Sequence, residues 1–168
     1  LLFAPHQGIL IKWWRNRALS LRILCDDVIA YLYRQQERTQ SQPATAAAAT
    51  AAPASASKQE LADELFASSS QIRAALSRLS RWGELQHAAN RYQLTDKGAQ
   101  HGRKLIRSHR LWEQYLVSEA SYDTIHGTAE LLEHFTDRSL RDQLSHATDA
   151  PTRDPHGTKI PPENGDAH

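Results

Sequence analysis

Residues 58–97 constrain the fold most, because helix and strand signals alternate there at short intervals. A helical apolar pattern over KQELADELFA is followed by Ser68-Ser69-Ser70, which supplies a turn and a helix cap. A second amphipathic pattern, QIRAALSRLSRW, runs up to Gly83, where the helix should end. Two strand-like segments, ELQHA and RYQLT, then flank Ala89-Asn90. This order predicts a helix-turn-helix motif with a hairpin wing.

The apolar positions of this segment predict a small core that needs a further helix. The buried set predicted from the two helices is Leu61, Leu65, Phe66, Ile72, Ala75, Leu76 and Leu79. Residues 20–37 have the matching helical pattern and are the natural third helix. Between them, residues 38–57 are a low-complexity Ala/Pro stretch, interpreted as a flexible insertion within one winged-helix domain spanning residues 20–97.

The outer face of the second helix carries the residues that predict DNA binding. The expected contacts to phosphates and base edges are Ser70, Gln71, Arg73, Ser77, Arg78 and Arg81. The formal net charge is only +1, so a nucleic-acid surface has to be local. The alternative is a winged helix that makes protein contacts only.

A stripe of potential metal ligands follows in TIHGTAELLEHF, residues 124–135. Helical spacing puts His126, Glu130, Glu133 and His134 on one face. His109 and Glu113 form another i, i+4 pair in the preceding predicted helix, within residues 98–118. Imidazole and carboxylate together suit manganese, iron or zinc. The alternative is that both sets are solvated helix faces, which is common for Glu and His.

The remaining predicted helices favour a mainly α chain with a dimer interface. Residues 98–146 read as an α-helical metal-binding and dimerisation domain, and residues 147–168 as an irregular tail. Three helices with this much aliphatic surface do not close a core alone, so a homodimer through the C-terminal helices is expected. No H-E-x-x-H, G-x-S-x-G or P-loop motif is present, which argues against an enzyme.

Residues 1–19 differ in character from the rest. Trp13 and Trp14 lie between Lys12 and Arg15, which is typical of a membrane helix at its cytoplasmic exit. An amphipathic helix start or a surface anchor is the alternative reading. The chain has no methionine and begins Leu1-Leu2, so we expect it to be the C-terminal part of a longer protein, with residues 1–19 as a membrane-exit stub.

With these pieces assembled, the sequence resembles the diphtheria-toxin-repressor and manganese-transport-regulator family. The segments that carry the resemblance are HRLWEQYL, IHGTAELLEH, YQLTDKGAQ and PTRDPHGTKIP. The family implies a dimeric winged-helix repressor that binds an operator when loaded with Mn²⁺ or Fe²⁺, with Zn²⁺ also allowed.

The resemblance also implies a ligand set. One site would use Asp27, Glu130, Glu133 and His134, and a second would use His109, Glu113 and His126. Where manganese-type members have a further carboxylate one turn after Asp27, this chain has Ala30, which puts a full two-manganese cluster in doubt. Metal would bridge the first helix to the dimerisation helices and so orient the recognition helices.

The segment LLFAPHQGILIKWWRNR is similar to the cytoplasmic end of permease subunits of manganese/zinc/iron ABC transporters. This second resemblance implies an alternative function, a cytoplasmic metal-sensing domain of a permease in which DNA binding is lost or secondary. Its partners would then include the membrane and an ABC ATPase subunit. The expected location is cytoplasmic, either free or tethered to the inner face of the plasma membrane.

Overall fold

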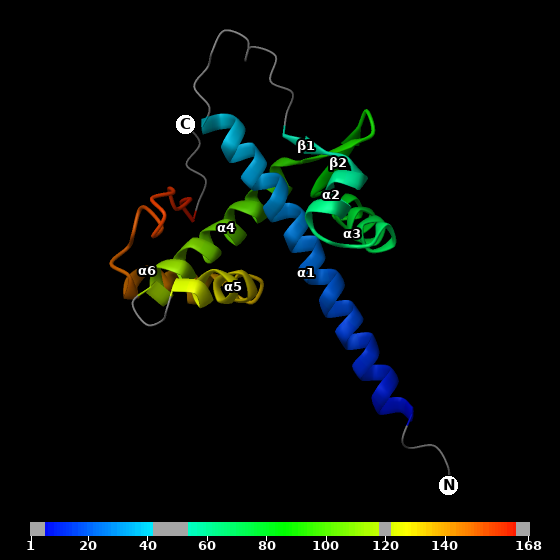
Figure 1. Ribbon diagram of the computed structural model, residues 1–168, viewed down its shortest axis with the longest axis horizontal. Coiled ribbons are helices and arrows are strands. Elements are labelled where there is room, and N and C mark those ends of the chain that lie inside the picture. Colours follow the sequence, from blue (N-terminus) through cyan, green and yellow to red (C-terminus); the bar gives the residue numbers. More distant parts are fainter. Residues whose placement is uncertain (1–5, 42–53, 118–121, 164–168) are drawn as a thin grey trace.

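The computed structural model describes residues 6–41, 54–117 and 122–163, and gives only the backbone for residues 6–19, 41 and 122–127. The elements, in chain order, are α1 (His6–Ser41), β1 (Ser55–Ala56), α2 (Lys58–Glu64), α3 (Ser69–Arg81), β2 (Leu85–Ala88), β3 (Arg91–Leu94), α4 (Asp96–Val117), α5 (Tyr122–Glu133) and α6 (Arg138–Ala147). Helices dominate, as predicted. Figure 1 shows α2, α3 and the sheet on one side of α1, with α4, α5 and α6 on the other.

Serine caps define the helix-turn-helix. Ser57 caps α2 and Ser68 caps α3, and in both cases the third helical residue, Glu60 or Gln71, returns a side-chain bond to the cap's backbone N–H. Helix α3 ends at Arg81 and is followed by Gly83 at φ +71°, a left-handed conformation that glycine adopts without a Cβ penalty. The two helices and their serine turn are therefore confirmed.

The wing is larger than the sequence indicates. Strands β2 and β3 form the expected antiparallel hairpin, with Ala89 and Asn90 at φ 48° and 60° in the tight turn. Strand β1 adds to the outer edge of β3, giving the sheet order β1-β3-β2. Arg91 holds this edge by donating to the Ser55 carbonyl at 2.6 Å and to Glu60 at 2.9 Å. The end of the segment predicted as linker is thus part of the sheet.

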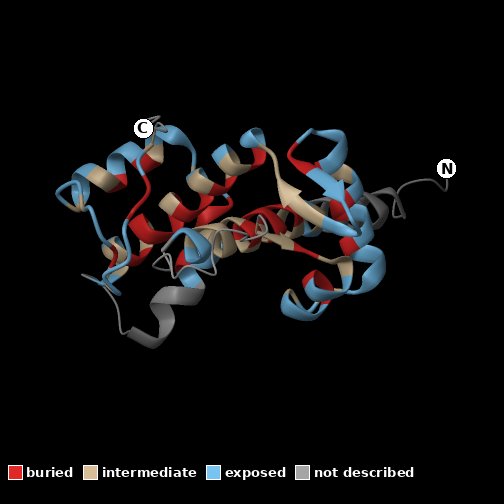
Figure 2. Cartoon of the chain, turned by 90° about the horizontal axis from the view of Figure 1, so that it is seen from above, coloured by how far each residue is buried: buried red, intermediate tan, exposed pale blue. Residues whose placement is uncertain are grey.

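One continuous core joins α1 to the winged helix. Val28, Ile29 and Leu32 of α1 are fully buried in the same cluster as Leu61 and Ile72. The prediction that residues 20–37 close this core agrees with the packing. Figure 2 shows buried residues on the inward faces of the helices and exposed ones on the outer turns and the wing.

Phe66 was predicted to be buried, and that prediction is wrong. Its side chain is 98% exposed. Helix α2 ends at Glu64, two residues before Phe66, and Phe66 adopts φ 48°. The helical spacing that would have pointed Phe66 into the core therefore stops before it, and Leu61 and Ala62 are the buried residues of α2.

Helix α1 is much longer than the predicted 20–37 segment. It runs unbroken through Gly8 and through the proposed boundary at residue 19, and it extends beyond the other elements at its N-terminal end (Figure 1). Among the described residues, none of the helices combines the length and the apolar character needed to cross a bilayer.

The C-terminal helices pack on α1 through a close contact. Helix α4 lies against both α1 and α5, and at Gly102 an added Cβ would come within 2.7 Å of Tyr33 Cβ. Residues 150–163 contain no helix but are held against the helices by Arg110 of α4, which donates to the Lys159 carbonyl at 2.6 Å. The same guanidinium donates two hydrogen bonds to Glu37 of α1. Arg141 of α6 likewise donates two hydrogen bonds to the Glu163 carboxylate, from Nε at 3.0 Å and from Nη2 at 2.7 Å.

Replacing Gly102 by Ala tests the α1–α4 contact. Intrinsic helix propensity alone would stabilise the variant by about 1 kcal/mol. The clash with Tyr33 should reverse that sign and cost roughly 1–3 kcal/mol, as overpacking does. Chemical denaturation of Gly102→Ala measures the effect, with Gln100→Ala at an exposed position of the same helix as control. A variant as stable as the parent would contradict the close packing.

Candidate metal centre and nucleic-acid interface

His109 on α4 is held between two carboxylates. Its Nε2 lies 3.2 Å from Oε1 of Glu113, one turn along the same helix, and its Nδ1 lies 2.6 Å from Oε2 of Glu133 at the end of α5. All three side chains are at most 6% exposed. Helical spacing brings Glu113 to His109, and the packing of α5 on α4 brings Glu133.

His134 makes the corresponding link between α5 and α1. It follows the last residue of α5 directly and points at two neighbouring carboxylates of α1. Its Nδ1 lies 3.4 Å from Oδ2 of Asp26, and its Nε2 lies 3.4 Å from Oδ1 of Asp27. The His134 side chain is 3% exposed, whereas Asp27 is 29% exposed and reaches solvent.

The electrostatics of both imidazoles favour the cationic form. Burial lowers the pKa of His109, but Glu113 and Glu133 outweigh it and raise the pKa to about 9. Burial likewise opposes charging of His134, and Asp26, Asp27 and Glu133 together raise its pKa to about 10. A divalent cation would have to displace a proton from each imidazole before binding to it.

The chemistry of the donors fits a divalent transition metal. Oε2 of Glu133 and Nδ1 of His134 are buried and, within the described residues, make ion-pair contacts without a hydrogen bond. Buried polar atoms of this kind are costly unless they are satisfied. Each of the two imidazoles lies between two carboxylates. Among the described residues, no group of three His, Cys, Asp or Glu side chains is already arranged to hold a metal ion. Coordination of a metal ion would therefore require these side chains to rearrange.

The predicted ligands divide into those that meet and those that do not. Asp27 and His134 are brought together, and so are His109, Glu113 and Glu133. Glu133 therefore touches the predicted second site rather than standing apart from it. Glu130 is exposed on α5 and, in the described part of the chain, pairs with no other candidate ligand. The side chain of His126 lies outside the described residues.

Sequence reasoning missed several residues of this region. Asp26 is 6% exposed, and its Oδ1 lies 3.6 Å from Nε2 of His101 on α4. The other nitrogen of His101 lies 3.4 Å from Glu84 at the start of the wing. His156 of the tail approaches Glu113 at 3.8 Å. His156 could have been found from its place in PTRDPHGTKIP, one of the segments that carry the family resemblance. Glu84 and His101 have no spacing in the sequence that would link them to the other candidate ligands.

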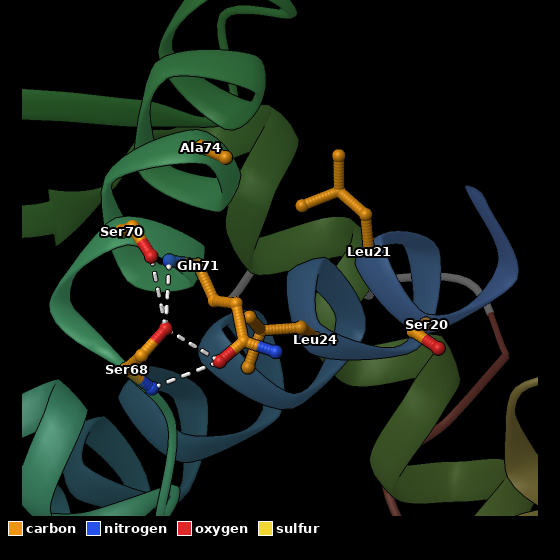
Figure 3. Close-up of a pocket in the computed structure, with 7 residues that line it drawn as sticks. All are labelled: Ser20, Leu21, Leu24, Ser68, Ser70, Gln71 and Ala74. Carbon is orange, nitrogen blue, oxygen red and sulfur yellow. Dashed lines mark hydrogen bonds between the residues drawn. The ribbon is translucent and has the colours of Figure 1, made fainter. Parts of the chain in front are cut away.

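The predicted DNA-contacting residues lie on the outer side of α3. Ser70, Gln71, Arg73, Ser77 and Arg81 are exposed, and Arg78 is partly exposed. Figure 3 shows Gln71 turned back toward the helix cap, where its Oε1 accepts from the Ser68 hydroxyl at 2.6 Å and the Ser68 N–H at 3.0 Å. Its side chain is therefore engaged in the capping box.

The arginines of α3 differ in their local contacts. Arg81 donates to the Ser77 carbonyl at 3.2 Å, and Arg78 stacks over the Trp82 ring at 4.4 Å. Arg73 is exposed and, among the described residues, makes no ion pair. It is therefore the arginine most available to a phosphate.

Known metal-dependent repressors are similar to this chain in sequence and in fold. Residues 95–162 match the family model described as iron dependent repressor, metal binding and dimerisation domain. A manganese-dependent transcriptional repressor solved in complex with manganese aligns with a TM-score of 0.66 and 29% identity, over 84% of this chain and 60% of that one.

Two kinds of relative are similar in sequence. The iron-dependent repressor IdeR of Mycobacterium leprae is 31% identical over 107 residues, which are 62% of this chain and 46% of the repressor. A probable metal transport system membrane protein of Chlamydia trachomatis is 36% identical over 100 residues, 58% of this chain but 22% of that protein. The chain thus spans less than half the length of either relative. Over residues 95–162 the chain is therefore similar to the metal binding and dimerisation domain of iron-dependent repressors, and its fold is similar to that of the manganese-dependent repressor.

Proposed function

We propose that this chain is a transition-metal-dependent transcriptional regulator that binds DNA. The observation that carries the proposal is the contact of His134 with Asp26 and Asp27, because it joins the helix that closes the winged domain to the C-terminal helices. A metal ion bound there would fix the two parts relative to each other. Binding free energy would then favour one orientation of α3.

The proposed ligands fall into two neighbouring groups. Asp27, Glu133 and His134 would hold one ion, with Glu130 joining them from the preceding turn of α5. His109 and Glu113 would hold a second, with His126 of α5 and His156 of the tail as further donors. Carboxylate oxygen and imidazole nitrogen suit Mn²⁺ and Fe²⁺, and also Zn²⁺.

DNA would be bound as a homodimer. The outer face of α3 would enter the major groove, with Arg73 and Arg81 on phosphates or guanine edges. Val117, Leu131 and Phe135 are 40%, 58% and 53% exposed and provide apolar surface near α4 and α5 for a second copy.

A second candidate function is favoured by the Chlamydia relative. That protein is described as part of a metal transport system and is 36% identical over the matched residues. The same domain could sense cytosolic metal and control a permease that carries it. Membrane association of the native full-length protein distinguishes this function from that of a free regulator, and metal-dependent DNA affinity tests whether DNA binding is kept.

Substitution of the proposed ligands should weaken metal binding. Because loss of even an outer-shell partner costs about 10–100-fold in affinity, Glu133→Gln and His134→Ala should each cost at least that much for Mn²⁺. Calorimetric titration measures it. Asp142→Asn and His146→Ala, at exposed positions of α6, are matched controls. Unchanged stoichiometry and affinity in the Glu133 and His134 variants would remove both residues from the site.

Metal binding should release protons and weaken as the pH falls. His109 and His134 have pKa values raised to about 9 and about 10, so both imidazoles carry a proton at pH 7.5. Coordination needs the neutral rings. Titrations in buffers of different ionisation enthalpy should give different heats, and affinity should rise from pH 6.5 toward pH 9. Heats that do not depend on the buffer would contradict the assigned protonation.

DNA binding should depend on metal, on Arg73 and on salt. If Arg73 meets a phosphate, Arg73→Gln should weaken binding to all sequences and reduce the salt slope by about one unit. Gel-shift titrations of the protein's own promoter, with and without Mn²⁺, measure this. Arg138→Gln, exposed on α6, is the charge-matched control. The absence of any metal-dependent, salt-sensitive shift would exclude the repressor function.

A further inference from the structure

A cleft of about 500 Å³ opens between α1, α3, α4 and the turn after α5. Its basic lining residues are Arg22 of α1, Arg78 of α3, Lys104 and His101 of α4, and Arg141 of α6. Asp26, Glu133 and His134 also line it, and the indole of Trp82 forms part of its wall. The cleft therefore reaches from an exposed basic rim to buried ionisable side chains.

The cleft has more positive side chains than its own carboxylates can neutralise. Its two carboxylates are already paired with imidazoles: Asp26 lies 3.6 Å from His101 and 3.4 Å from His134, and Glu133 lies 2.6 Å from His109. Arg141 is satisfied by Glu163. By contrast, Arg22, Arg78 and Lys104 make no ion pair with any residue that the structure describes.

Three cations gathered at one opening repel each other and attract a counter-ion. A guanidinium presents a fork of N–H donors that matches a phosphate or carboxylate group, and a lysine adds a point charge. These three side chains come from three different helices, so one multivalent anion could be contacted from several sides.

The shape of the cleft favours a small anion over a nucleic-acid strand. Its volume lies in the range of roughly 300–1,000 Å³ typical of small-molecule pockets. Glu133 and His134 line its buried part, with side chains that are 2% and 3% exposed. A volume of this size can hold a free phosphate or pyrophosphate, but not a segment of duplex.

We propose that this cleft binds a small phosphate-class oxyanion through Arg22, Arg78 and Lys104. The ligand would connect α3, the proposed recognition helix, to α1 and α4. This inference goes beyond metal-dependent regulation and does not depend on it, because the cations that carry it are not proposed metal ligands.

To test this, metal ions are removed from the protein with a chelator, and the chelator is then removed by dialysis. Inorganic phosphate and pyrophosphate are titrated into the metal-free protein at low salt, and binding is measured by calorimetry. Binding should be measurable, and Arg22→Gln and Lys104→Gln should each weaken it by about tenfold, the loss expected for one charge-assisted contact. Both side chains are exposed, so the fold should be kept, and melting temperature checks this.

Matched controls separate a site from general charge. Arg38→Gln on α1 and Arg103→Gln, next to Lys104 on α4, do not line the cleft and should bind phosphate like the parent. The proposal is overturned if phosphate and pyrophosphate do not bind at millimolar concentration, or if the control variants lose as much affinity as the cleft variants. It is also overturned if Arg22→Gln and Lys104→Gln weaken binding of a random-sequence duplex but not of phosphate, since the cleft rim would then belong to the DNA surface.

Discussion

The contact between His134 and the paired aspartates of α1 is the interaction on which the rest of the molecule depends. It buries an imidazole at the junction of α1 and α5, and the neighbouring His109 is buried in the same way between α4 and α5. Removing one partner of a buried pair typically costs about 3–5 kcal/mol, so these groups need one another or a metal ion. This row of charged side chains therefore lies where the two halves of the structure meet, and a metal ion bound there, as we propose, would act on both.

The same chain of contacts continues to the wing. Asp26 touches His134 with one oxygen and His101 with the other, and His101 touches Glu84, which directly precedes β2. If a metal ion bound His134 and displaced Asp26, the change would therefore reach Glu84 at the base of the hairpin through His101. The proposed phosphate-binding cleft is lined by Asp26, His101 and His134 themselves, so its ligand and the metal would act on the same part of α1 and α4.

Much of this architecture was predictable from local patterns. Serine caps, a glycine stop and helical spacing predicted α2 and α3, and two strand-like segments around Ala89-Asn90 predicted the hairpin. Helical spacing alone put His109 beside Glu113. The rest depends on contacts between distant segments. Strand β1 is two residues long and exists because β3 offers it an edge. The burial of Asp26 likewise depends on distant segments, because His101 of α4 and His134 after α5 contact it.

Local structure also limits what helical periodicity can predict. Phe66 follows the end of α2, so the helical period that predicted its burial no longer applied. Gln71 remains a predicted DNA contact, and its amide oxygen also accepts hydrogen bonds in the cap of its own helix. Periodicity assigns a residue to a face of a helix, but it does not say which partner that face will meet.

A double-mutant cycle tests the central claim most directly, namely that α1 and the end of α5 supply ligands to one metal ion. Mn²⁺ affinity would be measured for Asp27→Asn, for the His134→Ala variant and for the two combined. Ligands of one ion should be strongly non-additive, so that the double variant loses much less affinity than the product of the two single losses. If the two losses simply multiply, Asp27 and His134 act independently, and the metal does not bridge the two halves of the chain.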